Sequence, residues 1–520
     1  MMQADVNSMR NARVTSVMLT KLNLRIDYLI FSFSANSYID LVDFFRQVTM
    51  KSNAIFLFLA SLWLMHDQAY GQYEYGYVPM DSFDLQKETL IDEINTDIAA
   101  IRSSLPRSSR DELKTILNYK AELLARRLRS NHFINDGELD QLVGKVYSEI
   151  TTKNPRAGYP TRIMISRSPV PNASCWGEGT MIINLGLLSR LNTESELAFI
   201  MAHEMAHQLL DHVNEATLSA IKRRSDRDLK RQAKTNGKLD VIKEIAYDDA
   251  RYSRIKEHEA DSMAVVLLRN TSYQWQVYER VLDMLDSADY PETRERPDLK
   301  SRFDFSKYPF KDKWLEPPHS GLGRSSNTGL FSADSLKSHP NIPKRIAYVD
   351  SLYGYNAGKK GYDPSDDRIS SSLQQRIDLE MTSSTFVIND YAKSMFYTLQ
   401  MLAQYPENKF LKTHLARLLV ELYLSRKNHT YNRYVRISNY YPKMMEELFI
   451  FLNNLRMSEI AKLAYNYINR DAVFDKTNEE HYFLLFIIST GLDNLEVSEK
   501  VLTAYKNSFP NGQYLEAMKL

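Results

Sequence analysis

Residues 193–212 read TESELAFIMAHEMAHQLLDH, and this stretch decides how the rest of the chain is interpreted. Its first four residues, TESE, have the spacing of a capping box and predict that a helix begins there. His203 and His207 are four positions apart, so they lie on one face of that helix, where both imidazoles can bind one metal ion. Glu204 lies at the rim of such a site and can accept a proton from water without being a ligand.

A catalytic zinc site needs a third protein ligand and keeps a fourth position for water. The sequence EHEAD at 257–261 supplies candidates. Glu257 and Asp261 share a helix face, so Glu257 can bind the metal while Asp261 accepts the outer N–H of a ligand histidine. Glu259 is an alternative ligand that the spacing does not exclude. His212 is expected to be structural, because a fourth protein ligand would displace the water.

Composition limits the classes of protein to consider. The chain has 520 residues, with 66 Lys and Arg against 65 Asp and Glu, and this balance argues against a nucleic-acid partner. The single cysteine, Cys175, excludes a disulfide within the chain and any cysteine-based metal cluster. A content of 43% hydrophobic and 25% charged residues is typical of a folded protein, and only 17 glycines favour a helical one.

The patterning predicts a mainly α fold with a small β-sheet at 72–370, followed by an all-α helical-hairpin domain at 371–520. Short strands are expected only around 162–188. Residues 286–338 are rich in Pro, Ser, Asp and Gly and are too long for a structureless connection, so they are expected to form a lid or a linker. The C-terminal helical units resemble tetratricopeptide repeats, with an irregular helical bundle as the alternative.

The longest apolar run, AIFLFLASLWLM at 54–65, is too short to span a bilayer as a helix. Small residues follow it with the spacing of a signal-peptidase site. We therefore expect a signal peptide at 50–71, a natural start at Met50, and a non-native upstream extension at 1–49. A short membrane anchor and a buried helix are the alternatives. The expected location is the periplasm, or the periplasmic side of a membrane.

HEMAH and EHEAD are followed by His339-Pro340, with Arg345 six residues after the histidine. Together with the upstream strand pattern GEGTMIINLGLL, this order of motifs resembles the zinc metallopeptidase family that contains the CAAX prenyl protease, HtpX and BepA. The resemblance covers roughly residues 80–350. It implies an α+β zincin-type metallopeptidase domain at 72–370, and the architecture is closest to the periplasmic members with a C-terminal tetratricopeptide-like region.

The resemblance also implies roles for individual residues. It implies that one Zn²⁺ per chain is held by three ligands: His203, His207 and Glu257. Glu204 is then the general base of a gluzincin, and Asp261 and Arg345 support the ligands from outside. His339 is expected near the zinc, where it either stabilises the oxyanion or caps the metal in a closed state.

We therefore expect an exported zinc endopeptidase in envelope protein quality control, with unfolded or misassembled envelope proteins as substrates. The substrate peptide is expected to add as a strand along an exposed sheet edge formed by Met181, Ile182, Ile183 and Asn184. The alternative is a chaperone-like or scaffold protein that binds partners through its helical domain and has a latent or His-capped zinc site. Glu204 argues against this alternative, because a purely structural metal site needs no base.

Overall fold

The computed structural model describes ten stretches of the chain. The expected signal peptide at 50–71, the expected extension at 1–49 and His339 all lie outside them. No helix within these stretches is long and apolar enough to cross a membrane. The described residues are 77–83, 86–104, 110–176, 178–215, 254–286, 296–317, 342–353, 367–435, 443–492 and 494–518.

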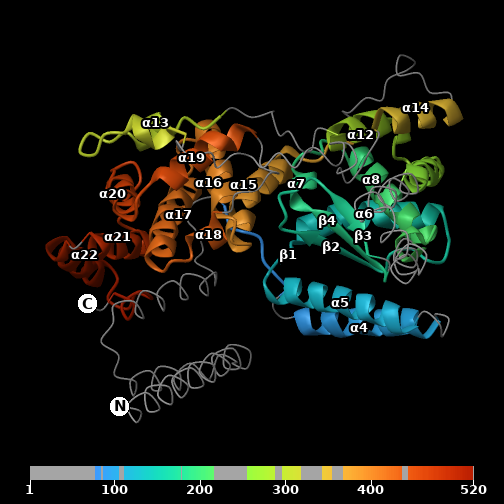
Figure 1. Ribbon diagram of the computed structural model, residues 1–520, viewed down its shortest axis with the longest axis horizontal. Coiled ribbons are helices and arrows are strands. Elements are labelled where there is room, and N and C mark those ends of the chain that lie inside the picture. Colours follow the sequence, from blue (N-terminus) through green and yellow to red (C-terminus); the bar gives the residue numbers. More distant parts are fainter. Residues whose placement is uncertain are drawn as a thin grey trace, which may run out of the picture. The chain divides into compact units, whose positions relative to one another are not determined.

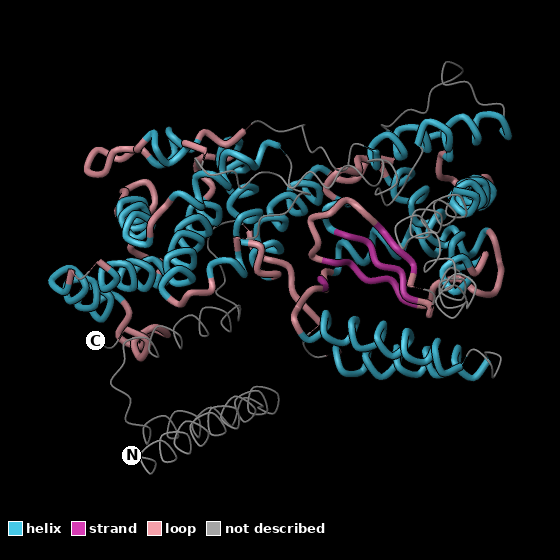
Figure 2. The backbone as a smooth tube through the Cα atoms, viewed as in Figure 1, coloured by secondary structure: helices cyan, strands magenta, loops and turns pink. Residues whose placement is uncertain are grey.

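A mainly α fold with a small β-sheet is confirmed (Figures 1 and 2). The sheet has the strand order β1-β2-β4-β3, in which β2 and β4 are parallel and the two outer pairs are antiparallel. The strands are β1 (Phe133–Ile134), β2 (Arg162–Ser166), β3 (Ala173–Cys175) and β4 (Thr180–Asn184). Three of them lie in the region where strands were expected. The fourth strand, β1, was not predicted, because two residues are too few to show a strand pattern.

The predicted exposed edge at Met181, Ile182, Ile183 and Asn184 is wrong, because this segment is the interior strand β4. Met181, for example, pairs with Ile163 of β2 on one side and with Cys175 of β3 on the other. Side chains of β4 are also buried on both faces of the sheet: Met181 and Ile183 join one hydrophobic core, and Ile182 joins another. An unbroken apolar run is typical of such a doubly covered strand. On this side of the sheet, within the described residues, the edge strand is β3.

Helices cover both faces of the sheet (Figure 1). The hairpin of α4 (Lys87–Ser104) and α5 (Arg110–Arg129) packs on one face, through a core that includes Ile182. On the other face lie α6 (Gly137–Lys153) and α8 (Glu194–Leu209), and the short helix α7 (Leu185–Leu188) follows β4 directly. This layered arrangement buries α8 and brings it beside β3.

Three further helical segments complete this part of the chain. Residues 254–268 are helical. The 3₁₀-helix η3 (Trp275–Val277) leads into α12 (Tyr278–Asp286), and α14 (Ile342–Tyr353) packs against α12. Each contributes buried residues to the same core as α8, so the histidine-bearing helix is held on several sides.

From residue 371 onward the described chain contains only helices, and many of them begin at a side chain that caps the first turn. Ser370, Asp390, Asn408, Asn478 and Asn494 are such caps. The α-helices are α15 (Ser371–Val387), α16 (Tyr391–Gln404), α17 (Lys409–Lys427), α18 (Tyr431–Tyr434), α19 (Glu446–Asn454), α20 (Met457–Ile468), α21 (Glu479–Gly491) and α22 (Leu495–Ser508), and η7 (Lys443–Met445) is a 3₁₀-helix.

Residues 296–317, part of the expected lid or linker at 286–338, form an ordered strap on the helical domain. The strap contains α13 (Leu299–Phe303) and η5 (Asp312–Leu315). Trp314 is fully buried and packs edge-on against Phe451 of α19. The Asn454 side-chain amide donates to the carbonyl oxygens of Trp314 and Glu316, at 3.2 and 2.8 Å. Aromatic residues between the turn-forming ones thus anchor this part of the segment.

A buried ion pair joins the sheet to the helical domain. Arg167, just after β2, places Nη1 2.6 Å from Glu380 Oε1 of α15, and both side chains are almost fully buried. Arg167 Nη2 also donates to the carbonyl oxygen of Met80, and the Tyr77 hydroxyl donates to Glu380. The two parts of the chain therefore share one buried polar network.

Candidate metal centre

The helix α8 carries the first two candidate ligands and begins where the capping box predicts. The Thr193 hydroxyl accepts the N–H of Glu196, and Glu196 Oε2 accepts the N–H of Thr193, both at 3.3 Å. Asp367, from the segment before α15, also accepts the N–H of Ser195 at 2.9 Å. The N-terminus of this helix is thus held both by its own sequence and by a distant carboxylate.

His203, His207 and Glu257 each place one donor atom within 4.8 Å of the others, and they are a group of residues that can hold a metal ion. The two Nε2 atoms are 3.1 Å apart. Glu257 Oε2 lies 3.6 Å from Nε2 of His203, and Glu257 Oε1 lies 3.5 Å from Nε2 of His207. A tetrahedral zinc with bonds of about 2.0–2.1 Å places its ligand atoms roughly 3.4 Å apart. The observed spacing therefore fits zinc.

The donor atoms are also of the kinds that bind zinc. Nδ1 of His203 lies 3.0 Å from Asp261 Oδ1, and Nδ1 of His207 lies 3.0 Å from Nδ1 of His212. With Nδ1 of each ring directed to a partner, Nε2 of each ring is directed toward Glu257. Two imidazole nitrogens and one carboxylate are a ligand set that catalytic zinc sites use. A cation among them is attracted by all three donors.

Asp261 and Arg345 lie directly behind the candidate ligands. The helix at 254–268 places Glu257 and Asp261 one turn apart. Arg345 of α14 donates from Nε and Nη2 to the two oxygens of Asp261, at 2.7 and 2.6 Å. Its Nη1 lies 2.7 Å from Glu257 Oε2. One guanidinium therefore holds the ligand carboxylate and the carboxylate that faces His203.

The charged groups in this cluster stabilise one another in their ionised forms. Burial raises the pKa of Asp261, but Arg345 and His203 outweigh it and hold that pKa below its usual value. Burial lowers the pKa of Arg345, but Asp261 and Glu257 raise it above its usual value. Burial also lowers the pKa of His203, whereas Asp261 and Glu257 raise it, with a net rise. Asp261 thus stays ionised and able to accept a hydrogen bond.

Glu204, the candidate base, is buried and is held by the edge strand. Its Oε2 accepts the backbone N–H of Cys175 in β3 at 3.0 Å. No sequence motif marks this contact, because every residue except proline has a backbone N–H. Burial, aided by Glu204 and Glu178, raises the pKa of the Cys175 thiol well above its usual value. The thiol is therefore protonated near neutral pH and is poorly suited to act as a nucleophile.

Two further candidates from the sequence, Glu259 and His212, are not part of the three-residue cluster. Glu259, the alternative ligand, has a half-exposed side chain whose Oε2 lies 3.1 Å from Nε2 of His212. His212 is buried and contacts the outer nitrogen of His207. His339 lies outside the described residues. The structure thus gathers Glu204, Asp261 and Arg345 around the three candidate ligands.

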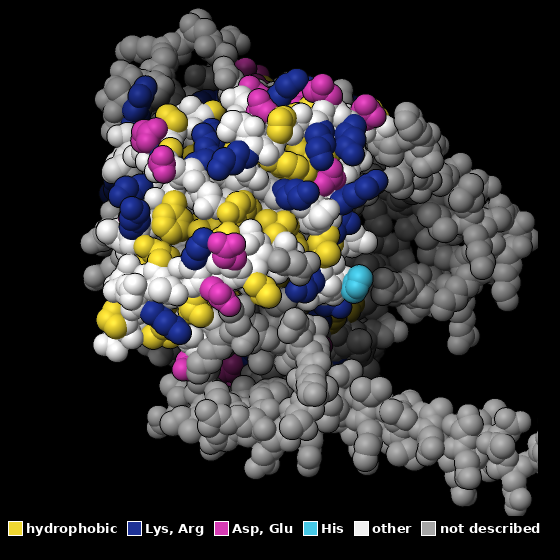
Figure 3. Space-filling model, turned by 90° about the vertical axis from the view of Figure 1, so that its left-hand side faces the viewer, with side chains coloured by type: hydrophobic (Ala, Val, Ile, Leu, Met, Phe, Trp, Pro, Cys, Tyr) yellow, Lys and Arg dark blue, Asp and Glu magenta, His cyan; other side chains and the backbone are white. Residues whose placement is uncertain are grey.

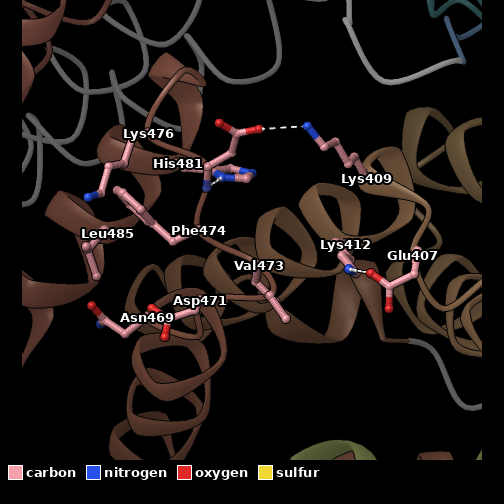
Figure 4. A pocket seen from close by; sticks show the side chains of 12 residues that line it. Glu407, Lys409, Lys412, Asn469, Asp471, Val473, Phe474, Lys476, His481 and Leu485 are labelled. Carbon is pink, nitrogen blue, oxygen red and sulfur yellow. Dashed lines mark hydrogen bonds and ion pairs between the residues drawn. The ribbon is translucent and has the colours of Figure 1, made fainter.

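A separate cavity lies in the helical domain (Figure 4). It has a volume of about 680 Å³ and is lined by Glu407, by residues of α17 and α21, and by residues of the loop between α20 and α21. The Lys409 ammonium lies 3.1 Å from Asp475, and that of Lys412 lies 2.8 Å from Glu407. Two lysines of the lining are thus paired with carboxylates that also line the cavity.

A comparison with known protein families supports a metal-binding site at these residues. Residues 134–352 match the model of peptidase family M48, a family of zinc metallopeptidases. The matched segment runs from β1 into α14, so it contains α8, the helix at 254–268 and Arg345. The similarity supports a metallopeptidase with polypeptide substrates. No curated protein matches this sequence.

Proposed function

We propose that this protein is an exported zinc endopeptidase of the gluzincin type that acts in envelope protein quality control. One observation carries the proposal: a buried carboxylate, Glu204, lies on the same helix turn as two histidines whose Nε2 atoms converge with Glu257 at zinc-ligand spacing. A structural metal site does not need such a base. The expected signal peptide at 50–71 and the family resemblance support export.

His203, His207 and Glu257 would hold the zinc, and its Lewis-acid character would make the attacking water reactive near neutral pH. Glu204 accepts the proton of the attacking water and delivers it to the leaving amine of the peptide. The hydrogen bond from the Cys175 N–H fixes the position of the Glu204 carboxylate. Asp261 and Arg345 hold the ligand side chains, so little reorganisation is needed during the reaction.

The substrate peptide is proposed to lie along β3. Asn184 N–H donates to the Asn172 carbonyl and Trp176 N–H donates to the Thr180 carbonyl, so these residues of the β3 segment point toward β4. In an antiparallel pair the hydrogen-bonding direction alternates, which directs the backbone N–H and carbonyl of Ala173 and the carbonyl of Cys175 outward. The N–H of Cys175 also points outward, but it is bonded to Glu204. A peptide added at this edge lies next to Glu204. Backbone pairing of this kind is indifferent to substrate side chains and suits broad specificity.

The helical domain is proposed to recruit unfolded or misassembled envelope proteins. Figure 3 shows the side of the helical domain on which α20, α21 and α22 lie, where hydrophobic side chains are mixed with basic and acidic ones. Met457 of α20 and Leu495 of α22 are among the exposed large hydrophobic residues. The buried Arg167–Glu380 pair supports the view that this domain is firmly attached to the peptidase part.

The test is hydrolysis of casein by the purified protein and by its Glu204→Gln variant. Removal of a general base lowers the rate by about 10²–10⁴-fold, so cleavage should fall by that factor while zinc remains bound at one ion per chain. Cleavage that persists in the variant would overturn the assignment. Tight client binding without cleavage by the wild type would favour the chaperone-like alternative.

Export is tested separately, by N-terminal sequencing of the protein isolated from cells. The expected mature end is near Gln72, and recovery of residues 1–49 in the mature protein would contradict the predicted signal peptide.

A further inference from the structure

We infer that His212 is a positioning residue for the candidate ligand His207, and that Glu259 in turn positions His212. This inference rests on the proposed zinc site. It assigns a role to two residues that the sequence analysis had set aside, one as structural and the other as an alternative ligand.

A chain of contacts runs from the candidate metal site to the surface. Nδ1 of His207 lies 3.0 Å from Nδ1 of His212, with the ring centroids 5.1 Å apart and the ring planes inclined at 70°. Nε2 of His212 lies 3.1 Å from Glu259 Oε2. His212 is 4% exposed, whereas the Glu259 side chain is 54% exposed. A buried imidazole thus connects a ligand ring to an exposed carboxylate.

Only one arrangement of protons satisfies all three residues when zinc is bound. His207 must present the lone pair of Nε2 to the metal, so its proton is on Nδ1. Nδ1 of His212 then has to accept that proton in a hydrogen bond, which leaves the His212 proton on Nε2. Glu259 accepts this second hydrogen bond. The chain therefore selects the metal-binding tautomer of His207 and fixes the rotation of its ring.

The backbone around His212 is itself held in place. Asp211 adopts the left-handed region with a φ of 56°, which turns the chain after α8. The carbonyl oxygen of His212 accepts a hydrogen bond from Lys256 Nζ at 2.8 Å, and Lys256 also lies 3.1 Å from Glu215. Because Lys256 directly precedes Glu257, the same helix supplies a metal ligand and the anchor of His212.

The two ligand histidines thus have different partners. His203 faces the carboxylate of Asp261, which Arg345 neutralises, whereas His207 faces an imidazole. Both arrangements orient the ligand ring without adding a net charge beside the metal. Loss of the His212 contact should therefore weaken zinc binding but not abolish it.

The test compares zinc affinity among variants of the purified full-length protein, by competition with a chelator. His212→Phe keeps an aromatic ring and removes the acceptor, so the dissociation constant for Zn²⁺ should rise about 10–100-fold. His212→Asn restores an acceptor at the δ position and should recover most of the affinity. Glu259→Gln should cause a smaller loss than His212→Phe. His132→Phe, at a histidine outside the cluster, is the matched control and should leave the affinity unchanged.

Two further measurements separate positioning from folding. The visible spectrum of the Co²⁺-loaded protein should change in His212→Phe and return toward wild type in His212→Asn, while thermal unfolding of the metal-free variants reports fold damage. A zinc affinity of His212→Phe equal to wild type, or a loss that Asn does not recover, overturns the inference. If His212→Phe fails to fold, Glu259→Leu decides, because it removes the acceptor of the His212 Nε2 proton, and an unchanged zinc affinity in that variant overturns the inference. Failure of the wild type to bind zinc would instead overturn the proposed function.

Discussion

Arg345 and Asp261 form a two-pronged ion pair, with nitrogen–oxygen distances of 2.7 and 2.6 Å, in which both side chains are almost fully excluded from solvent. Arg345 also lies 2.7 Å from the candidate ligand Glu257. One arginine from α14 therefore compensates two buried carboxylates on the helix at 254–268. Because removal of one partner leaves buried charge uncompensated, this contact is important for folding as well as for the site.

Arg345→Met should destabilise the metal-free protein by about 3–5 kcal/mol, because Asp261 and Glu257 lose their counter-ion. Urea unfolding monitored by circular dichroism measures this change. The control is Arg129→Met, which removes the exposed pair with Glu88 and should cost less than about 1 kcal/mol. Equal effects of the two substitutions would contradict the role given to the buried pair.

Zinc should raise the unfolding temperature of the wild type, because a ligand that binds only the folded state stabilises it. Glu257→Gln should lose most of this increase, since an amide is a poor replacement for a carboxylate ligand. Glu259→Gln should keep most of it. Thermal unfolding of both variants, with and without excess zinc, measures this increase. If Glu259→Gln lost more of the increase than Glu257→Gln, the third ligand would be Glu259.

Cys175→Ala should leave casein hydrolysis within about twofold of wild type, because Glu204 is held by the backbone N–H at this position, which alanine keeps. Thiol-directed reagents should not inhibit the native enzyme, since burial raises the pKa of the thiol and limits access to it. A rate assay before and after treatment tests both statements. Loss of activity in the alanine variant would show that the side chain itself takes part.

Glu380→Leu should weaken the attachment of the helical domain, because Arg167 then lacks its buried counter-ion and Tyr77 loses its acceptor. The expected loss is about 3–5 kcal/mol. Calorimetry should show the single unfolding transition of the wild type separating into two. Lys145→Met, which removes the pair between the exposed Lys145 and the mostly buried Glu194, should leave one transition, because this pair does not join the two domains.

Glu421 should make stability depend on pH. Burial raises its pKa from 4.5 to about 8, with Arg417 opposing the rise, so at neutral pH the folded protein holds a proton that the unfolded chain releases. The contribution of Glu421 to the free energy of unfolding is therefore greatest below pH 4.5 and falls as the pH rises toward about 8. Urea unfolding across this window should show a flatter pH dependence in Glu421→Gln than in the wild type. Parallel curves would refute the raised pKa.

Local sequence patterns were sufficient to predict the helices that carry the candidate metal site. The capping box set the start of α8, and the i, i+4 spacing placed His203 and His207 on one face, because both depend only on helix geometry. The same geometry put Glu257 and Asp261 on one face of a second helix. Helix spacing alone could not choose between Glu257 and Glu259, because that choice depends on how this helix packs against α8, and it was the family resemblance that implied Glu257.

The wrong assignment of the sheet edge, and the unpredicted fold of residues 296–317, come from the same limit. The apolar run at 181–184 correctly indicated a strand, but whether a strand is an edge depends on its neighbours in the sheet, and β2 and β3 flank it on both sides. Residues 296–317 look like a loop in composition, yet they fold onto α19 because Phe303 and Trp314 find an aromatic partner there in Phe451. A local pattern does not show such a partner.

The sequence by itself determined a mainly helical chain with a small sheet and a histidine helix of defined start and facing ligands. These features depend on residues within a few positions of one another, where backbone geometry sets the distances. Only the tertiary structure decided that Arg345 holds Asp261, that the Cys175 N–H holds Glu204, and that His212 contacts His207 and Glu259. Most of these contacts join residues far apart in the chain, so they depend on how the helices and the sheet pack.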